Sequence, residues 1–258
     1  MSGQAGPALD FTPAPAAAGP VRRWWAQARL EWRLLMTNGE QILLTLIIPI
    51  AVLVAVTRIG LAEVDEATPG VMALAILSTA FTATAIATGF ERRSGVLKFL
   101  GATPLGRSGL LAGKTTATFA VIVVQLVLLT LTATALGWDP GFGPPAAIIG
   151  VVVLGTLALG SWGLALAGLL RAEATLAVAN GIFLLLLLAG GTVLPADRLP
   201  GPLAAAVQYL PSAALGDGLR CALGAPSAGT CSVLGPVLIL TAWAAGGIAV
   251  ALRTFRWE

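Results

Sequence analysis

TTATFAVIVVQLVLLTLTATALGW, residues 115–138, is a run of 24 residues without a charged side chain. A helix needs about 20 apolar residues to cross a bilayer core of about 30 Å, and this run meets that length. Similar charge-free runs occupy residues 67–90, 140–170, 174–196 and 221–252, and a shorter one covers residues 41–57. The sequence therefore predicts an all-α, polytopic membrane protein with six transmembrane helices.

The composition agrees with a chain that lies mostly in lipid. Only 10% of its residues are charged and 57% are hydrophobic, whereas a soluble domain carries about 25% charged residues. The apolar runs are continuous and do not alternate, so helices are favoured over a barrel. His is absent, which excludes a histidine base or a histidine metal ligand. We expect no catalytic residue and no metal site.

The expected order of elements follows from these runs. Residues 1–20, rich in Pro, Ala and Gly, read as a disordered cytoplasmic tail without a cleavable signal peptide. Residues 22–37 repeat Arg and Trp at helical spacing, which is typical of an interfacial helix. The transmembrane domain occupies residues 21–258, with spans expected at about 41–60, 71–90, 115–136, 146–170, 174–194 and 232–252.

Charge placement predicts the topology. With six spans, twelve of the fifteen Lys and Arg residues fall on the side of the two termini, and Arg58, Arg198 and Arg220 fall on the other. Basic residues concentrate on the cytoplasmic side. We therefore expect both termini in the cytoplasm and the chain in the cell membrane. The net charge of +3 then reflects topology, and we expect no nucleic-acid partner.

Residues 195–220 are too broken to cross the bilayer, and we expect a pair of short re-entrant or interfacial helices there on the outer side. The breakers are Pro200, Pro202, Pro211 and Gly216. Cys221 and Cys231 fall near the same face. An oxidising compartment would permit a disulfide between them. Two small apolar residues at a helix start explain them as well, so the sequence leaves the pairing open.

Polar residues within the spans are few. No Asp, Glu, Lys or Arg lies in the middle of a span, which argues against a self-powered pump. Gln125 and Asn180 are expected to be interhelical hydrogen-bond partners rather than ligand groups. Lys114 follows Gly113 as in a phosphate-binding loop, but Ser108 stands where that motif needs Gly. We therefore expect Lys114 to be a snorkelling lysine at the start of the third span.

Residues 91–105, ERRSGVLKFLGATPL, join the second and third expected spans on the cytoplasmic side. The segment has an apolar face and charged flanks, and Gly101 and Pro104 end it. A short amphipathic helix of this kind suggests docking to a soluble partner. A loop that lies on the lipid headgroups is the alternative, and physical reasoning alone does not separate the two.

The pattern Glu-Arg-x-x-Gly-x-Leu-x-x-Leu-x-x-Thr-Pro-Leu in this segment resembles the ABC-2 type permeases of ATP-binding cassette transporters, particularly the daunorubicin-resistance-like exporters. The similarity extends over nearly the whole chain. It includes the interfacial helix, the six spans, the outer segment with Tyr209-Leu-Pro and Asp217-Gly-Leu-Arg220, and the basic end RTFR at residues 253–256.

The resemblance implies that residues 91–105 form the coupling helix, which contacts a separate ATP-hydrolysing subunit. The residues assigned to this contact are Glu91, Arg92, Arg93, Gly95, Leu97, Lys98, Leu100 and Pro104, with Leu97 and Leu100 as its exposed apolar anchor. The resemblance also implies a pathway between protomers, lined by spans 2 and 5. The residues assigned to the pathway are Thr82, Thr84, Asn180, Phe183 and Thr192.

The function implied is that of the permease subunit of an exporter for a drug or lipid-like substrate, as in multidrug efflux. The chain itself would hold no cofactor, since ATP and Mg would bind to the partner ATPase. Its other partners would be a second permease copy or a related permease, and membrane lipids. Two alternatives remain at this point: a non-transporting structural or sensory subunit, and a membrane-embedded lipid-modifying enzyme, which would need a buried acid, base or metal cluster.

Overall fold

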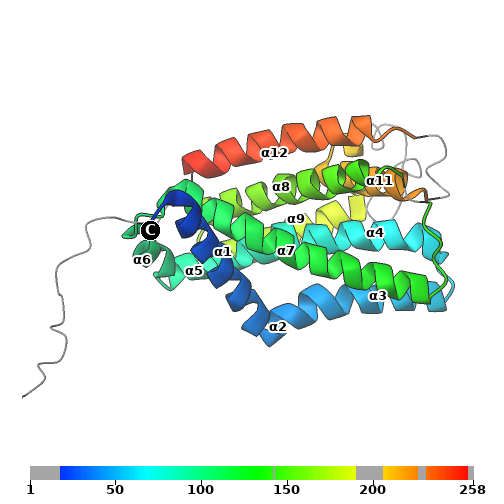
Figure 1. The fold of residues 1–258 in the computed structure, drawn as a ribbon, viewed down its shortest axis with the longest axis horizontal. Coiled ribbons are helices and arrows are strands. Elements are labelled where there is room, and N and C mark those ends of the chain that lie inside the picture. The colour runs from blue at the N-terminus through cyan, green and yellow to red at the C-terminus, as the bar shows by residue number, and fades with distance from the viewer. Residues whose placement is uncertain (1–17, 142, 190–205, 226–230, 255–258) are drawn as a thin grey trace, which may run out of the picture.

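The computed structural model describes residues 18–141, 143–189, 206–225 and 231–254, and every regular element in these ranges is a helix. Most helices run along one common axis (Figure 1). The predicted all-α class is therefore confirmed. The predicted tail at residues 1–20 lies almost entirely outside the described residues.

Two of the elements, η1 and η2, are π-helical turns inside longer helices. The elements are α1 (Pro20–Thr37), α2 (Gly39–Ile42), η1 (Leu43–Ile47), α3 (Ile48–Arg58), α4 (Val64–Ile76), η2 (Leu77–Ala83), α5 (Thr84–Arg93), α6 (Val96–Gly101), α7 (Gly106–Ala135), α8 (Pro145–Leu169), α9 (Ala172–Ala189), α11 (Pro211–Leu223) and α12 (Leu234–Thr254).

Five helices of the described residues are long and apolar enough to cross a membrane. They are the continuous helices Gly39–Arg58 and Val64–Arg93, together with α7, α8 and α12. The apolar part of α9, Ala172–Leu188, is shorter. The sixth crossing, expected at residues 174–194, stays a prediction, because its end lies outside the described residues.

The second and third spans begin earlier than predicted. The second span was expected to begin at about residue 71, but α4 starts at Val64 and takes Asp65 and Glu66 into its first turn. Carboxylates are favourable there because they face the positive end of the helix dipole. Likewise α7 starts at Gly106, so Lys114 lies eight residues inside a helix and not at its start. An apolar run marks where a helix enters lipid, not where it begins.

Helix α8 lies at the centre of the bundle and packs against α12, α11, α5 and η2. Its small residues allow the close approach. A Cβ atom on Gly163 would lie 2.6 Å from the carbonyl oxygen of Phe81, and one on Gly155 would meet Leu215 at the same distance. Small residues at helix contacts are the usual means of tight packing in membranes.

The two ends of the bundle differ. The start of α1, the short helix α6 and the end of α12 gather at one end, and α11 and the start of α4 lie at the other (Figure 1). At that second end α11 is a single, mostly buried helix that begins at Pro211 and continues through Gly216. The predicted break at Gly216 is therefore wrong. The predicted pair of re-entrant helices stays untested, because residues 195–205 lie outside the described ranges.

Cys221, in α11, and Cys231, just before α12, are joined as a disulfide, with their Cα atoms 5.8 Å apart. Of the two alternatives left open by the sequence, the structure therefore has the oxidised pair. It ties the end of α11 to the start of α12 at the bundle end opposite α1 and α6.

Candidate functional site: a polar cavity beside residues 91–105

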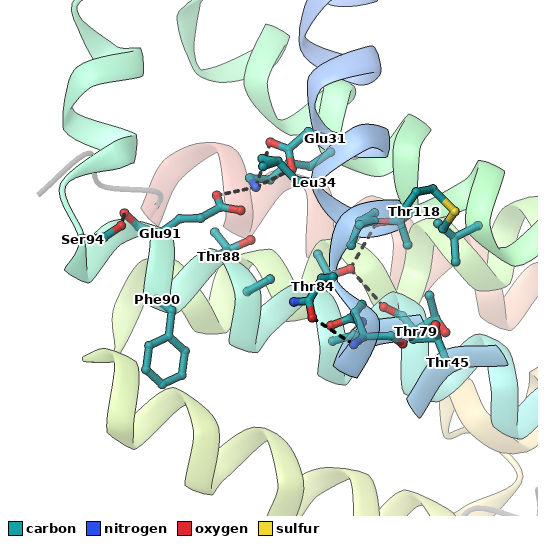
Figure 2. Close-up of a pocket in the computed structure, with 18 of the residues that line it drawn as sticks. Glu31, Leu34, Thr45, Thr79, Thr84, Thr88, Phe90, Glu91, Ser94 and Thr118 are labelled. Carbon is teal, nitrogen blue, oxygen red and sulfur yellow. Dashed lines mark hydrogen bonds and ion pairs between the residues drawn. The ribbon is translucent and has the colours of Figure 1, made fainter. Parts of the chain in front are cut away.

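A cavity of about 620 Å³ lies between α1, the helix Gly39–Arg58, the helix Val64–Arg93 and α7. Figure 2 shows hydroxyl and carboxyl groups from these elements facing one another across it. The polar or charged residues that line it are Glu31, Asn38, Gln41, Thr45, Thr79, Thr84, Thr88, Glu91, Arg93, Ser94, Lys114 and Thr118. Such a concentration of polar groups between apolar helices is the first indication of a functional site.

Next to the cavity wall, the buried amide of Gln125 links both π-helical turns. Its Nε2 donates to the backbone oxygen of Thr45 in η1 and to Oγ1 of Thr79 in η2, at 2.9 Å from the latter. The Thr79 hydroxyl lies 3.1 Å from Gln125 Oε1. π-helical turns are rare and occur often at functional sites. The prediction that Gln125 is an interhelical hydrogen-bond partner is confirmed.

Threonines continue this network along the wall. Thr84 donates to the backbone oxygen of Thr79 at 3.0 Å and its hydroxyl lies 3.2 Å from that of Thr118 on α7. The Thr88 hydroxyl is buried, and it has no hydrogen-bond partner in the described part of the protein. A buried polar group without a partner is costly. Thr88 is therefore a position at which a bound molecule would gain a hydrogen bond.

At the mouth of the cavity, three charged side chains from three elements meet, of which Glu31 and Lys114 are buried and Glu91 is partly buried. Lys114 Nζ of α7 lies 2.9 Å from Glu31 Oε1 of α1 and 2.5 Å from Glu91 Oε2 of α5. Gln27 Nε2 donates to Glu31 Oε1 at 2.7 Å. The carboxylates of Glu31 and Glu91 approach each other from opposite sides in Figure 2. This ion cluster fixes the interfacial helix α1 to the end of the second span.

The close contact of α1 with α7 is what brings Glu31 to Lys114. A Cβ atom on Gly113 would lie 2.6 Å from the Cγ atom of Gln27, so Gly at this position lets the two helices touch. The Lys114 side chain is only 4% exposed. The prediction that Lys114 snorkels to the headgroups is therefore wrong, and its charge is matched by carboxylates instead. The segment around it is helical and does not form a phosphate-binding loop.

Arg92 and Arg93 join the end of α5 to the turn between α8 and α9. Arg92 donates to the backbone oxygens of Ala167, Gly168 and Leu170, at 3.0, 2.8 and 2.6 Å. These carbonyls end α8, where a cation is favoured by the helix dipole. Arg93 forms an ion pair with Glu173 at the start of α9. Arg92 therefore serves within the chain and is not a free docking group.

Helix α6 follows Gly95, whose φ of +79° is a left-handed conformation that suits glycine. Leu97 is fully buried with Leu110, Leu164 and other apolar residues. Leu97 was expected to be an exposed anchor, and this is wrong. The helical turn points Leu97 and the partly buried Leu100 into the bundle.

The exposed apolar side chains of α6 are Phe99, 77% exposed, and Val96, 43% exposed. Lys98 is exposed on the same short helix. At the end of the segment, the backbone oxygen of Pro104 accepts a hydrogen bond from Arg23 of α1. The segment is thus fixed by its ends and presents Phe99 outward.

The residues expected to line a pathway do not gather in one place. Thr84 lines the cavity, but Thr82, Asn180 and Phe183 do not. Asn180 is exposed on α9, so its predicted role as an interhelical partner is wrong within this chain. Phe183 packs partly buried against the main core. Thr192 lies outside the described residues.

Sequence reasoning missed Glu31 and the burial of Lys114. Two signals were present. Glu31 is the single acid among four arginines in residues 22–37, and Lys114 follows the apolar run LLAG, which continues into the span. Both charges lie where an apolar helix face continues, and such charges need a partner. When helices are predicted from charge-free runs alone, their charged ends are left out, and the pairing of Glu31 with Lys114 is missed.

The comparisons with known proteins agree with this architecture. No curated protein matches the sequence. The family described as ABC-2 type transporter matches residues 22–223, which is well over half of the chain. That range includes α1, the cavity, residues 91–105 and α11. The chain belongs to the ABC-2 type transporter family and is a permease component of an ABC transporter, a multi-pass membrane protein that partners with an ABC ATPase subunit.

Proposed function

We propose that this permease exports an amphiphilic substrate, drug-like or lipid-like, from the cytoplasm across the cell membrane. The energy comes from ATP and Mg bound in the separate ATPase subunit, and this chain catalyses no reaction itself. Both termini and residues 91–105 face the cytoplasm. A second copy of the chain or a related permease completes the transporter.

The observation that carries the proposal is the connection between residues 91–105 and the cavity wall. Glu91 begins the segment and binds Lys114 at the mouth of the cavity. Arg92 and Arg93 bind the end of α8 and the start of α9. A push on α6 by a partner is therefore passed to α5, α7 and α8 together. Motion of this kind, in which packed helices shift as units, is how domain movements reach a binding site.

The cavity supports an amphiphilic substrate over a purely apolar one. The sequence suggested few polar groups near the pathway, but the folded chain collects hydroxyls from Thr45, Thr79, Thr84, Thr88 and Thr118 on one cavity. Apolar Leu34, Leu35, Phe90 and Val121 share the lining. A molecule with one polar and one apolar part matches both surfaces.

Phe99→Ser tests the coupling role. Phe99 is 77% exposed, so the change should leave folding and membrane insertion intact. It should lower co-purification of a Walker-motif ATPase from the native host, or lower substrate-stimulated ATP hydrolysis by the complex. An exposed aromatic anchor of an interface is typically worth about 2 kcal/mol or more, which corresponds to a loss of about thirtyfold or more in affinity.

Leu61→Ser is the matched control, because Leu61 is 73% exposed and lies at the other end of the bundle. The Leu61→Ser protein should bind the ATPase, and show substrate-stimulated ATP hydrolysis, like the unchanged protein. Unaltered partner binding and unaltered stimulation in the Phe99→Ser protein would refute the coupling assignment. A complex that hydrolyses ATP without moving any amphiphile would instead favour a structural or sensory subunit.

A further inference from the structure

A second hollow, which we call the leaflet groove, lies between α1, α7, α8 and α12 and has a volume of about 580 Å³. It is separate from the polar cavity, because the two share no lining residue. Trp24 of α1 forms part of its wall and donates from Nε1 to Thr116 Oγ1 at 3.3 Å. Nothing in the proposed transport function uses this groove.

The groove is apolar in its chemistry despite several hydroxyl residues in its lining. Thr116, Thr156 and Ser161 each donate to a backbone oxygen of their own helix, at 2.8, 2.7 and 3.0 Å. Those hydroxyls are therefore satisfied, in contrast to Thr88 in the polar cavity. Ser108 and Thr115 also line the groove. The rest of its surface, which consists largely of methyl groups and aromatic rings, suits an alkyl chain.

The length of the groove matches one leaflet of a membrane. On α7 the lining extends from Ser108 to Phe119, which at the rise of an α-helix is about 16 Å. Half of a hydrocarbon core of about 30 Å is about 15 Å. On α8 the lining from Val153 to Leu164 has the same length. The groove therefore accommodates a chain that starts at one surface of the membrane and reaches its middle.

No charged side chain is among the residues that line the groove, but two arginines lie next to lining residues in the chain. Ser108 and Leu252 line the groove at the ends of α7 and α12, and each is adjacent in the chain to an exposed arginine, Arg107 and Arg253. These two helix ends lie at the same end of the bundle (Figure 1). Neither arginine forms an ion pair with another residue in the described ranges. Basic pockets between membrane helices bind the headgroups of anionic lipids.

We propose that the leaflet groove binds one anionic phospholipid of the leaflet that faces α6. One acyl chain lies along α7 and α8 against Trp24, and the phosphate is held by Arg107 and Arg253. A zwitterionic phospholipid has the same acyl chain but no net charge, so it binds more weakly. This binding does not depend on the partner ATPase or on transport.

Lipid retention by the purified full chain tests the proposal. The probes are dioleoylphosphatidylglycerol and dioleoylphosphatidylcholine, added to delipidated protein in neutral detergent. Retention is measured by native mass spectrometry and the stabilisation by the shift in unfolding temperature. Two arginines near an anionic headgroup contribute about 1 kcal/mol each, so phosphatidylglycerol should bind about thirtyfold more tightly at low salt. This preference should shrink at high salt.

Variants distinguish recognition of the headgroup by the arginines from binding of the acyl chain in the groove. Arg107→Gln with Arg253→Gln should remove the preference for phosphatidylglycerol and leave phosphatidylcholine retention unchanged. Ala112→Trp, which fills the groove from α7, should reduce retention of both lipids. The controls are Arg29→Gln, an exposed arginine of α1, and Val123→Trp, on an exposed face of α7 outside the groove. Both should retain lipid like the unchanged protein.

Three results would overturn the proposal. Equal retention of the two lipids by the unchanged protein would show that the arginines recognise no headgroup. An unchanged preference in the double arginine variant would place the headgroup elsewhere. Full lipid retention by Ala112→Trp would show that the acyl chain does not occupy the groove. The arginine variants change only exposed side chains, so this arm remains informative if Ala112→Trp does not fold.

Discussion

At the scale of single residues, the polar cavity depends on a few buried side chains that each contact more than one helix. Lys114 binds Glu31 of α1 and Glu91 of α5. Gln125 binds both π-helical turns. Each of these residues replaces water as the partner of polar groups that the bilayer would leave unsatisfied. Removing one of them therefore affects several elements at once.

Lys114→Met should strongly destabilise the protein, because it leaves the buried carboxylate of Glu31 and the partly buried carboxylate of Glu91 close together without their cation. Breaking a buried ion pair by removing one partner costs about 3–5 kcal/mol. The measurement is unfolding in mixed detergent and dodecyl sulfate micelles. Arg93→Gln is the control, since the side chains of Arg93 and Glu173 are 61% and 64% exposed and an exposed pair contributes about 1 kcal/mol at most. Equal stability of the two variants would show that the buried cluster is not needed for the fold.

Gln125→Leu should loosen the link between the two π-helical turns. Hydrogen bonds between membrane helices contribute about 0.6 to 2 kcal/mol, and the Thr45 carbonyl and the Thr79 hydroxyl would lose this donor. We expect a loss of stability in that range and faster hydrogen exchange within η1 and η2. Thr134→Val, which removes an exposed hydroxyl bonded to its own helix, should change neither. Unchanged exchange in Gln125→Leu would contradict the role of this amide.

At the scale of elements, helix contacts depend on where glycines fall. Gly163 of α8 faces the backbone of η2, and Gly150 of the same helix has nothing within 4 Å of where its Cβ atom would lie. The same residue type thus has opposite consequences at two positions thirteen residues apart in the chain. The contact of α8 with η2 also supports one wall of the polar cavity, because η2 carries Thr79.

Gly163→Ala should destabilise the bundle, because its Cβ atom would lie 2.6 Å from the Phe81 carbonyl oxygen. Backbone atoms cannot move aside cheaply, and overpacking of this kind costs about 1–3 kcal/mol. Gly150→Ala should be neutral or stabilising by up to about 1 kcal/mol, since Ala favours the helix. Thermal unfolding of the two variants side by side makes the comparison. A Gly163→Ala protein as stable as Gly150→Ala would rule out the close contact.

At the scale of the whole molecule, the bundle has two chemically distinct ends. Arginines and the segment 91–105 gather where α1 begins and α12 ends, and the acidic first turn of α4 and the disulfide lie at the opposite end (Figure 1). Because basic residues favour the cytoplasmic side, we expect the protein to insert with this basic end in the cytoplasm. That orientation would place α6 where a soluble ATPase can reach it and the disulfide in an oxidising compartment.

Reporter fusions test this orientation. A fusion after Glu258 should report a cytoplasmic location, and a fusion inserted near Asp139, which is exposed after the end of α7, should report an external one. Basic residues near the membrane determine which end stays inside. A matched pair of fusions with an alkaline phosphatase and a fluorescent protein gives opposite signals at each site. An external signal at Glu258 would refute the six-span topology.

The sequence by itself determined the class of protein and most of its elements. In lipid, the backbone N–H and C=O groups of a long charge-free run need hydrogen-bond partners within the protein, and a helix supplies them. The pattern in residues 91–105 indicated the family. Burial and pairing were decided by the tertiary structure. Leu97 is buried and Phe99 is exposed because α6 packs against the bundle with one face only. Lys114 is buried because Gly113 lets α1 approach α7 closely. Contacts between residues 83 positions apart, such as Glu31 with Lys114, depend on which helix faces meet, and a local pattern does not contain that information.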